Sequence, residues 1–163
     1  PETSSMGRLF DAVSSVLGLR SAVRYEGQAA IELETIADRS VDDAYDFSFS
    51  DGGRRIGAEV VFQRIVDDLV DNVPAPVISA RFHNGVARLI VTVAEGIRDD
   101  RGLDRVALSG GVFQNVLLLG LTSTLLRAAG FEVLTHHRVP PNDGGISLGQ
   151  VAVANAIIGS GRT

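Results

Sequence analysis

Two glycine-rich turns carry most of the residues in this sequence that could do chemistry. The first, Ser109-Gly110-Gly111, follows a short apolar run and precedes a helical pattern. A glycine pair between a strand and a helix lets the backbone approach a phosphate closely, and the helix start directs amide groups and about half a positive charge at it. Asn115 is expected one turn into that helix, where its side chain could hydrogen-bond a substrate. A glycine pair after a strand is also a common tight turn, so the pattern alone leaves both interpretations open.

The second turn contains Asp143, directly before Gly144-Gly145 and a further helical pattern. Aspartate commonly caps helix starts, which is the structural interpretation. The functional interpretation is a carboxylate ligand for a hard or borderline metal ion. Nothing near Asp143 in the sequence completes such a site. His136 and His137 are adjacent, so on a strand they point to opposite faces, and His83 stands alone.

A third pair, Gly7 and Asp11, lies at the start of the first helical pattern. Residues four apart share one face of a helix. An aspartate in the first turn is stabilised by the helix dipole, which explains Asp11 without a ligand. The alternative is that Asp11 binds a ribose diol, with Gly7 leaving room for the sugar.

The elements that must position these residues follow from hydrophobic periodicity and from turn signals. Ile31, Leu33 and Ile36 are expected on the inner face of the helix after Gly27. Helices are predicted at Leu9 to Leu17, after Gly27, and at Glu59 to Val70, Val77 to Arg101, Val112 to Ala129 and Ile146 to Ile158. A hairpin is predicted within Val41 to Arg55, and two strands, parallel because a helix separates them, at Arg105 to Leu108 and Phe131 to Thr135.

The expected architecture is a single α/β domain over residues 1–163. In open α/β sheets, ligands bind at the carboxyl ends of the strands. Two loops leave such ends, Ser109 to Asn115 and His136 to Gly145, so the two glycine-rich turns are expected on the same side of the sheet.

Composition narrows the functional classes. The net charge is −5 with no basic cluster, which argues against electrostatic capture of nucleic acid. No apolar run approaches the roughly 18 residues that a membrane span needs, so no membrane partner is expected. Cysteine is absent, which excludes disulfides and thiolate sites and fits a cytoplasmic protein. All 15 basic residues are arginine, which excludes a lysine Schiff base and a phosphate-binding lysine.

Several segments, in chain order, resemble the C-terminal part of the HypF carbamoyltransferases, which take part in nickel–iron hydrogenase maturation. The resemblance covers almost the whole chain, and its last segment is very specific. The segments are Thr3 to Ala12, Tyr25 to Ala30, Ala80 to Gly85, Leu108 to Asn115 and Val139 to Gln150. The glycine pair and the aspartate turn are also similar to those of the tRNA threonylcarbamoyltransferases, but the local sequences around Asn115 and Asp143 favour HypF.

The resemblance implies a ribonuclease-H-like lobe of the actin/Hsp70-like ATPase (ASKHA) fold. This chain would be the second lobe of a Kae1-like module, a fragment of a larger protein. In the family, carbamoyl phosphate and ATP give a carbamoyl-adenylate on a neighbouring YrdC-like module. The Kae1-like module then passes the carbamoyl group to a cysteine thiol of the partner protein HypE.

The resemblance also implies roles for individual residues. Gly7 and Asp11 would bind the ribose, while Gly110, Gly111 and Asn115 would line the adenylate and its phosphate. Asp143 would be a ligand of a divalent metal, iron or zinc. The family's other metal ligands form an HxxxH motif in the first lobe, which this sequence lacks, so the chain alone is expected to be inactive.

Other classes of function stay open at this point. One is a tRNA-modifying relative, and another is a sugar-kinase or Hsp70-like ATPase lobe. A third is a non-catalytic module that docks a partner domain through its exposed face.

Overall fold

The computed structural model describes residues 5–53 and 55–159 of the chain. Thr3 and Ser4, which open the N-terminal motif, lie outside the described residues. The helices are α1 (Met6–Val16), α2 (Gln28–Ile36), α3 (Glu59–Val70), α4 (Ala75–Arg101), α5 (Val116–Ala128) and α6 (Ile146–Gly159), with short 3-10 helices η1 (Gly111–Gln114) and η2 (Asp143–Gly145). The strands are β1 (Ser48–Ser50), β2 (Arg55–Gly57), β3 (Arg105–Ala107) and β4 (Glu132–Leu134). Helices and strands are therefore mixed, as expected, although the strands are short.

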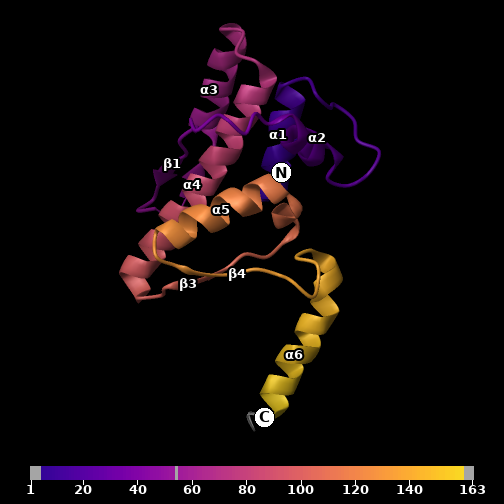
Figure 1. Ribbon diagram of the computed structural model, residues 1–163, viewed down its shortest axis with the longest axis vertical. Coiled ribbons are helices and arrows are strands. Elements are labelled where there is room, and N and C mark those ends of the chain that lie inside the picture. The colour runs from indigo at the N-terminus through magenta and orange to yellow at the C-terminus, as the bar shows by residue number, and fades with distance from the viewer. Residues whose placement is uncertain (1–4, 54, 160–163) are drawn as a thin grey trace.

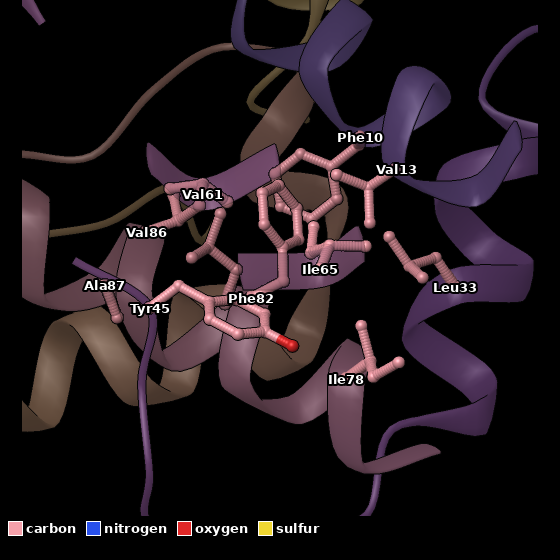
Figure 2. Packing of buried hydrophobic residues seen from close by; sticks show 11 residues of the cluster. Phe10, Val13, Leu33, Tyr45, Val61, Ile65, Ile78, Phe82, Val86 and Ala87 are labelled. Carbon is pink, nitrogen blue, oxygen red and sulfur yellow. The ribbon is translucent and has the colours of Figure 1, made fainter. Parts of the chain in front are cut away.

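The long helix α4 is the centre of the packing. It begins after Pro74 and ends at Gly102, and it contacts α2, α3 and α5 (Figure 1). The main core forms around its N-terminal half, where the rings of Phe10 and Phe82 meet edge to face at 4.8 Å (Figure 2). Burying large apolar side chains of this kind stabilises a fold by roughly 1.5–3 kcal/mol each. The core members are Phe10, Val13, Leu33, Tyr45, Val61, Ile65, Ile78, Phe82, Val86, Ala87 and Leu118.

The extended segment before β1 packs directly against α4. The amide of Tyr45 donates to the carbonyl oxygen of Arg81 at 3.1 Å. A Cβ at Gly85, one turn further along, would lie 2.3 Å from the carbonyl oxygen of Tyr45, so a side chain at residue 85 would prevent this approach. The Tyr45 hydroxyl donates to Asp68 on α3, which also accepts from Arg81 at 2.7 Å. The segment is therefore fixed to α3 and α4 together.

The unit β3–α5–β4 positions the two glycine-rich turns. Its strands are parallel, with Val106 opposite Val133, which confirms the predicted pairing. A second, smaller apolar cluster lies beneath α5 and includes Phe131, whose ring stacks on the Arg98 guanidinium at 4.3 Å. Arg98 also donates to the carbonyl oxygen of Ala129 at 2.7 Å. These contacts join the unit to the C-terminal half of α4.

Three predictions from the sequence need correction. The helix after the glycine pair begins at Val116 and not at Val112, because η1 and Asn115 intervene. Ile31 is not on the inner face of α2, since its side chain is 50% exposed, while Leu33 is buried as expected. The hairpin exists, but its strands begin only at Ser48, because the preceding residues pack on α4 instead of pairing.

Two glycines of α4 provide a matched test of this packing. Gly85→Ala should lower the free energy of unfolding by about 2 kcal/mol or more, because the new Cβ collides with the Tyr45 backbone. Gly96→Ala meets no atom within 4 Å and should raise it by about 0.5–1 kcal/mol through helix propensity. Urea unfolding followed by circular dichroism measures both. Equal effects of the two substitutions would contradict the close approach.

Candidate functional site

The glycine turn begins where β3 ends. Gly110 has φ 101° and ψ 160°, a backbone conformation that is essentially restricted to glycine. The chain then enters η1, and the amides of Gly111 and Val112 have no acceptor among the described residues. Gly111 is exposed, and a Cβ there would meet nothing within 4 Å. The turn therefore presents open space and unpaired amide donors, which suits an anionic ligand.

The two glycine-rich turns are hydrogen-bonded to each other. The Gly110 amide donates to the carbonyl oxygen of Pro141 at 2.8 Å. The Ser109 hydroxyl and the His136 Nε2 atom lie 2.9 Å apart. This confirms the prediction that the loops leaving the two parallel strands lie at the same edge of the sheet.

Asn115 is the N-cap of α5 and does not lie within the helix. Its Oδ1 atom accepts from the Leu118 amide at 2.7 Å, so its Nδ2 atom must be the group that faces His83 Nε2 at 2.9 Å. The side chain is 8% exposed. Both ends of this amide are thus engaged by the protein, and a role in substrate binding stays a prediction.

His83 joins this cap to α4 from within the core. Its Nδ1 atom lies 2.8 Å from the Ser79 carbonyl oxygen, which can only accept, so Nδ1 carries the proton. Nε2 is then the acceptor for Asn115, and all polar atoms of the neutral ring are satisfied. Burial lowers the pKa of His83, although the Ser79 hydrogen bond and the Glu34 carboxylate partly oppose that effect. Protonation of Nε2 would set two donors against each other.

Glu34 contacts the start of α5, which the sequence analysis did not predict. From α2, its Oε1 atom accepts the amide of Leu117 at 3.0 Å, in the first turn of α5. Since Asn115 takes the next amide, the start of α5 already has protein partners, one of them a carboxylate. The positive end of this helix is therefore less available to a phosphate than expected. Among the described residues of η1 and the first turn of α5, the amides without an acceptor are those of Gly111, Val112 and Val116. No local sequence signal marks Glu34, because the contact joins residues 83 apart.

The helix with Gly7 and Asp11 lies beside the glycine turn. α1 and η1 are in contact. Asp11 is partly buried, and a Cβ at Gly7 would make only an ordinary contact, 3.7 Å from Ser5 Oγ. Packing within the described chain therefore does not require a glycine at position 7.

Asp143 is exposed at the start of η2. Asn142, and not Asp143, is the capping residue, because its Oδ1 atom accepts the Gly144 amide at 3.1 Å. The turn is compact, since a Cβ at Gly145 would lie 3.0 Å from the Pro140 carbonyl oxygen. Within residues 5–53 and 55–159, no group of three or more His, Cys, Asp or Glu side chains could hold a metal ion.

Two surface hollows lie elsewhere. One of about 420 Å³ is lined by residues 43–46 together with side chains of α3 and α4, and another of about 380 Å³ lies between α4 and the exposed side of α5. Neither includes the glycine turn or Asp143. Of the predicted site residues, Gly111 and Asp143 are exposed, Asp11 is partly buried and Asn115 is buried. None of the helices described here has the length and apolar character needed to cross a bilayer.

Residues 1–150 match the family model described as "Carbamoyltransferase, Kae1-like Domain, second subdomain". The chain belongs to the HypF carbamoyltransferase family. The HypF of Synechocystis sp. is 38% identical over 154 residues, and that of Rhizobium leguminosarum bv. viciae is 36% identical over 161 residues. The alignments include 93% and 97% of this chain but 19% and 20% of those relatives, so the chain spans about a fifth of their length. It spans 41% of a shorter HypF homologue from Cupriavidus necator, which is 34% identical.

Solved HypF structures show the same fold. A full-length HypF in a phosphate- and nucleotide-bound form superposes with a TM-score of 0.90 at 42% identity, over 95% of this chain and 21% of that one. HypF from T. kodakarensis superposes with a TM-score of 0.84 at 26% identity, over 96% of this chain and 20% of that one. The family predicted from the sequence motifs is confirmed.

The buried His83 predicts a pH dependence for this HypF-family subdomain. Because its pKa is lowered in the folded state, the unfolded chain binds more protons below about pH 6.5, the ordinary value of histidine. The free energy of unfolding should then fall as the pH drops from 7 to 5, by up to about 1.4 kcal/mol for each pH unit. His83→Gln, which does not titrate, should flatten this slope in urea unfolding at several pH values. An equally steep slope in the His83 variant would contradict this assignment.

Proposed function

We propose that this chain is the second lobe of a HypF carbamoyltransferase module, with the ribonuclease-H-like architecture of the actin/Hsp70-like ATPases. The module holds carbamoyl-adenylate, formed from carbamoyl phosphate and ATP on a YrdC-like module, and transfers the carbamoyl group to a cysteine thiol of HypE. The observation that carries this proposal is the hydrogen bond from Gly110 to Pro141, which joins the glycine turn to the Asp143 turn in a chain of this family.

The glycine turn is the part of the proposed site that binds the phosphate of the adenylate. The free amides of Gly111 and Val112 supply hydrogen-bond donors without a lysine, which this chain lacks entirely. A related full-length HypF is known in a phosphate- and nucleotide-bound form, which supports an anionic ligand of this kind. Preorganised backbone donors also hold a leaving phosphate in place without reorganisation during the reaction.

The helix beside this turn binds the ribose in our proposal. Asp11 accepts hydrogen bonds from the two hydroxyls, and Gly7 leaves space for the ring. Two observations support this assignment: α1 contacts η1, and neither the conformation nor the packing of α1 calls for a glycine at position 7. Asn115 positions the turn, because both ends of its side-chain amide are hydrogen-bonded within the protein.

The proposed reaction is an acyl-type substitution at the carbamoyl carbon. The HypE thiolate attacks this carbon and forms a C–S bond, while the bond to the phosphate oxygen breaks and AMP leaves with the electron pair. The thiol proton is lost to solvent before the attack. The backbone amides of the glycine turn orient the leaving group, so most of the rate enhancement comes from orientation and electrostatics.

In our proposal, Asp143 is the metal ligand that this lobe contributes. Its carboxylate is exposed, supplies a hard oxygen donor and has no ion-pair partner among the described residues. One carboxylate binds a divalent ion such as iron or zinc only weakly, so the other ligands come from the first lobe. When bound, such an ion would polarise the carbamoyl oxygen.

The glycine turn can be tested without disturbing the fold. Gly111→Ala should preserve stability, because the new Cβ meets no protein atom, but should weaken adenine nucleotide binding by about tenfold or more, a loss of about 1.4 kcal/mol. The binding constant is measured calorimetrically in a full-length carbamoyltransferase that carries this subdomain. Gly120→Ala, within α5 and equally free of contacts, is the control and should bind normally. Equal nucleotide binding by both variants would contradict the proposal that the glycine turn is part of the nucleotide site.

A substitution at Asp143 tests its role in carbamoyl transfer without affecting the fold. In the same full-length protein, Asp143→Ala should reduce carbamoyl transfer to a thiol acceptor by at least about 100-fold, since electrostatic stabilisation of the transition state is lost. Thermal stability and nucleotide binding should change little, because the side chain is exposed. Asp99→Ala, at an exposed carboxylate on α4, serves as the control. Transfer at the normal rate by the Asp143 variant would refute the assignment.

A further inference from the structure

The carboxylate of Glu34 lies at the start of α5, next to the glycine turn in the chain. From a partly buried position on α2, its Oε1 atom accepts the Leu117 amide at 3.0 Å. The backbone at this point is fixed, because the carbonyl oxygen of Leu33 accepts a 2.6 Å hydrogen bond from the buried Ser79 hydroxyl of α4. Glu34 therefore holds a negative charge at a defined place close to the turn that we propose binds phosphate.

The hydrogen bond to α5 does not require a charged partner. Asn115 already caps the helix with a neutral amide, and a neutral glutamine at position 34 could accept the Leu117 amide in the same way. Among the described residues, no arginine forms an ion pair with Glu34. The charge of Glu34 is therefore available to act on an anion that binds at the glycine turn.

A phosphate at this turn would lie within range of that charge. The amide of Val116 has no acceptor among the described residues, and the residue is 69% exposed. Val116 adjoins Leu117, and consecutive Cα atoms are about 3.8 Å apart. A phosphate on the Val116 amide would therefore lie within roughly 10 Å of the Glu34 carboxylate. This separation is no longer than the Debye length of about 10 Å at 0.1 M salt, so screening leaves part of the repulsion.

We infer that Glu34 is a specificity-determining residue that favours a monoanionic adenosine phosphate over a dianionic one, an inference that rests on the proposed function. Carbamoyl-adenylate carries one negative charge on its phosphate, because two of the phosphate oxygens are bonded to carbon. AMP has one such bond, and its second proton dissociates with a pKa of about 6, so it carries close to two charges at neutral pH. Coulomb repulsion is proportional to charge, so Glu34 opposes AMP about twice as strongly as carbamoyl-adenylate. The carboxylate therefore promotes release of AMP after transfer.

Glu34→Gln tests this inference, because it removes the charge and keeps the hydrogen-bond acceptor. In a full-length carbamoyltransferase that carries this subdomain, calorimetry at about pH 8 measures the affinity for AMP and for its monoanionic methyl ester. Only the binding that Gly111→Ala weakens is counted, which excludes nucleotide sites on other modules. Glu34→Gln should bind AMP about tenfold more tightly and the ester only about threefold more tightly, since the logarithm of the effect doubles with the charge. Glu59→Gln, at an exposed carboxylate on α3, is the control and should leave both affinities unchanged.

The ratio of the two affinities distinguishes an effect of charge from a change in the shape of the turn. A displaced turn would alter the binding of AMP and of its ester alike, so a purely structural role of Glu34 would leave the ratio unchanged. An unchanged ratio in Glu34→Gln, with binding still weakened by Gly111→Ala, would overturn the inference and leave the proposed function intact. If Gly111→Ala weakens the binding of neither ligand, the glycine turn is not a nucleotide site, and both the proposed site and the inference are rejected.

Discussion

The hydrogen bond between His83 and Asn115 joins the core of this subdomain to its glycine turn. His83 lies on α4, fully buried among the rings of Phe10 and Phe82. Asn115 caps α5 with one end of its amide and reaches His83 with the other. Buried polar groups are stable only when they are paired, so each side chain fixes the orientation of the other. The position of the glycine turn thus depends on two polar side chains that are bound to each other within the protein.

Most elements of the fold could be predicted from the sequence because their signals are local. Apolar spacing and flanking proline or glycine residues locate α3 and α4, and a helix between two apolar runs predicts the parallel pairing of β3 and β4. Local signals do not predict the structure where contacts between residues far apart in the sequence determine it. Tyr45 alternates like a strand residue but packs on α4, and Ile31 has helix spacing but faces solvent because α1 and α4 take up the other side of α2.

The candidate site was predictable to a similar extent. The shared edge of the two turns follows from the topology, and the structure confirms it through the Gly110–Pro141 hydrogen bond. The exact start of α5 does not follow from the sequence, since a 3-10 turn and an α-helix have nearly the same apolar pattern. Glu34 could not be identified either, because its partner is distant in sequence and becomes adjacent only after folding. The specific motifs identified the family, whereas spacing alone supported several classes of function.

The contacts that form the two turns join residues closer in sequence than the contacts that attach the turns to the rest of the chain. Parallel pairing of Arg105 with Glu132 closes a segment of 27 residues, whereas the Glu34 contact spans 83. Loop-closure entropy grows with such separation, so the strand–helix–strand unit can assemble before it is anchored. The shape of the glycine turn is therefore set by contacts between residues close in the chain, whereas its position relative to α2 is set by a contact between distant residues. Loss of the Glu34 contact would therefore change where the start of α5 lies relative to α2 and would leave the pairing of β3 with β4 intact.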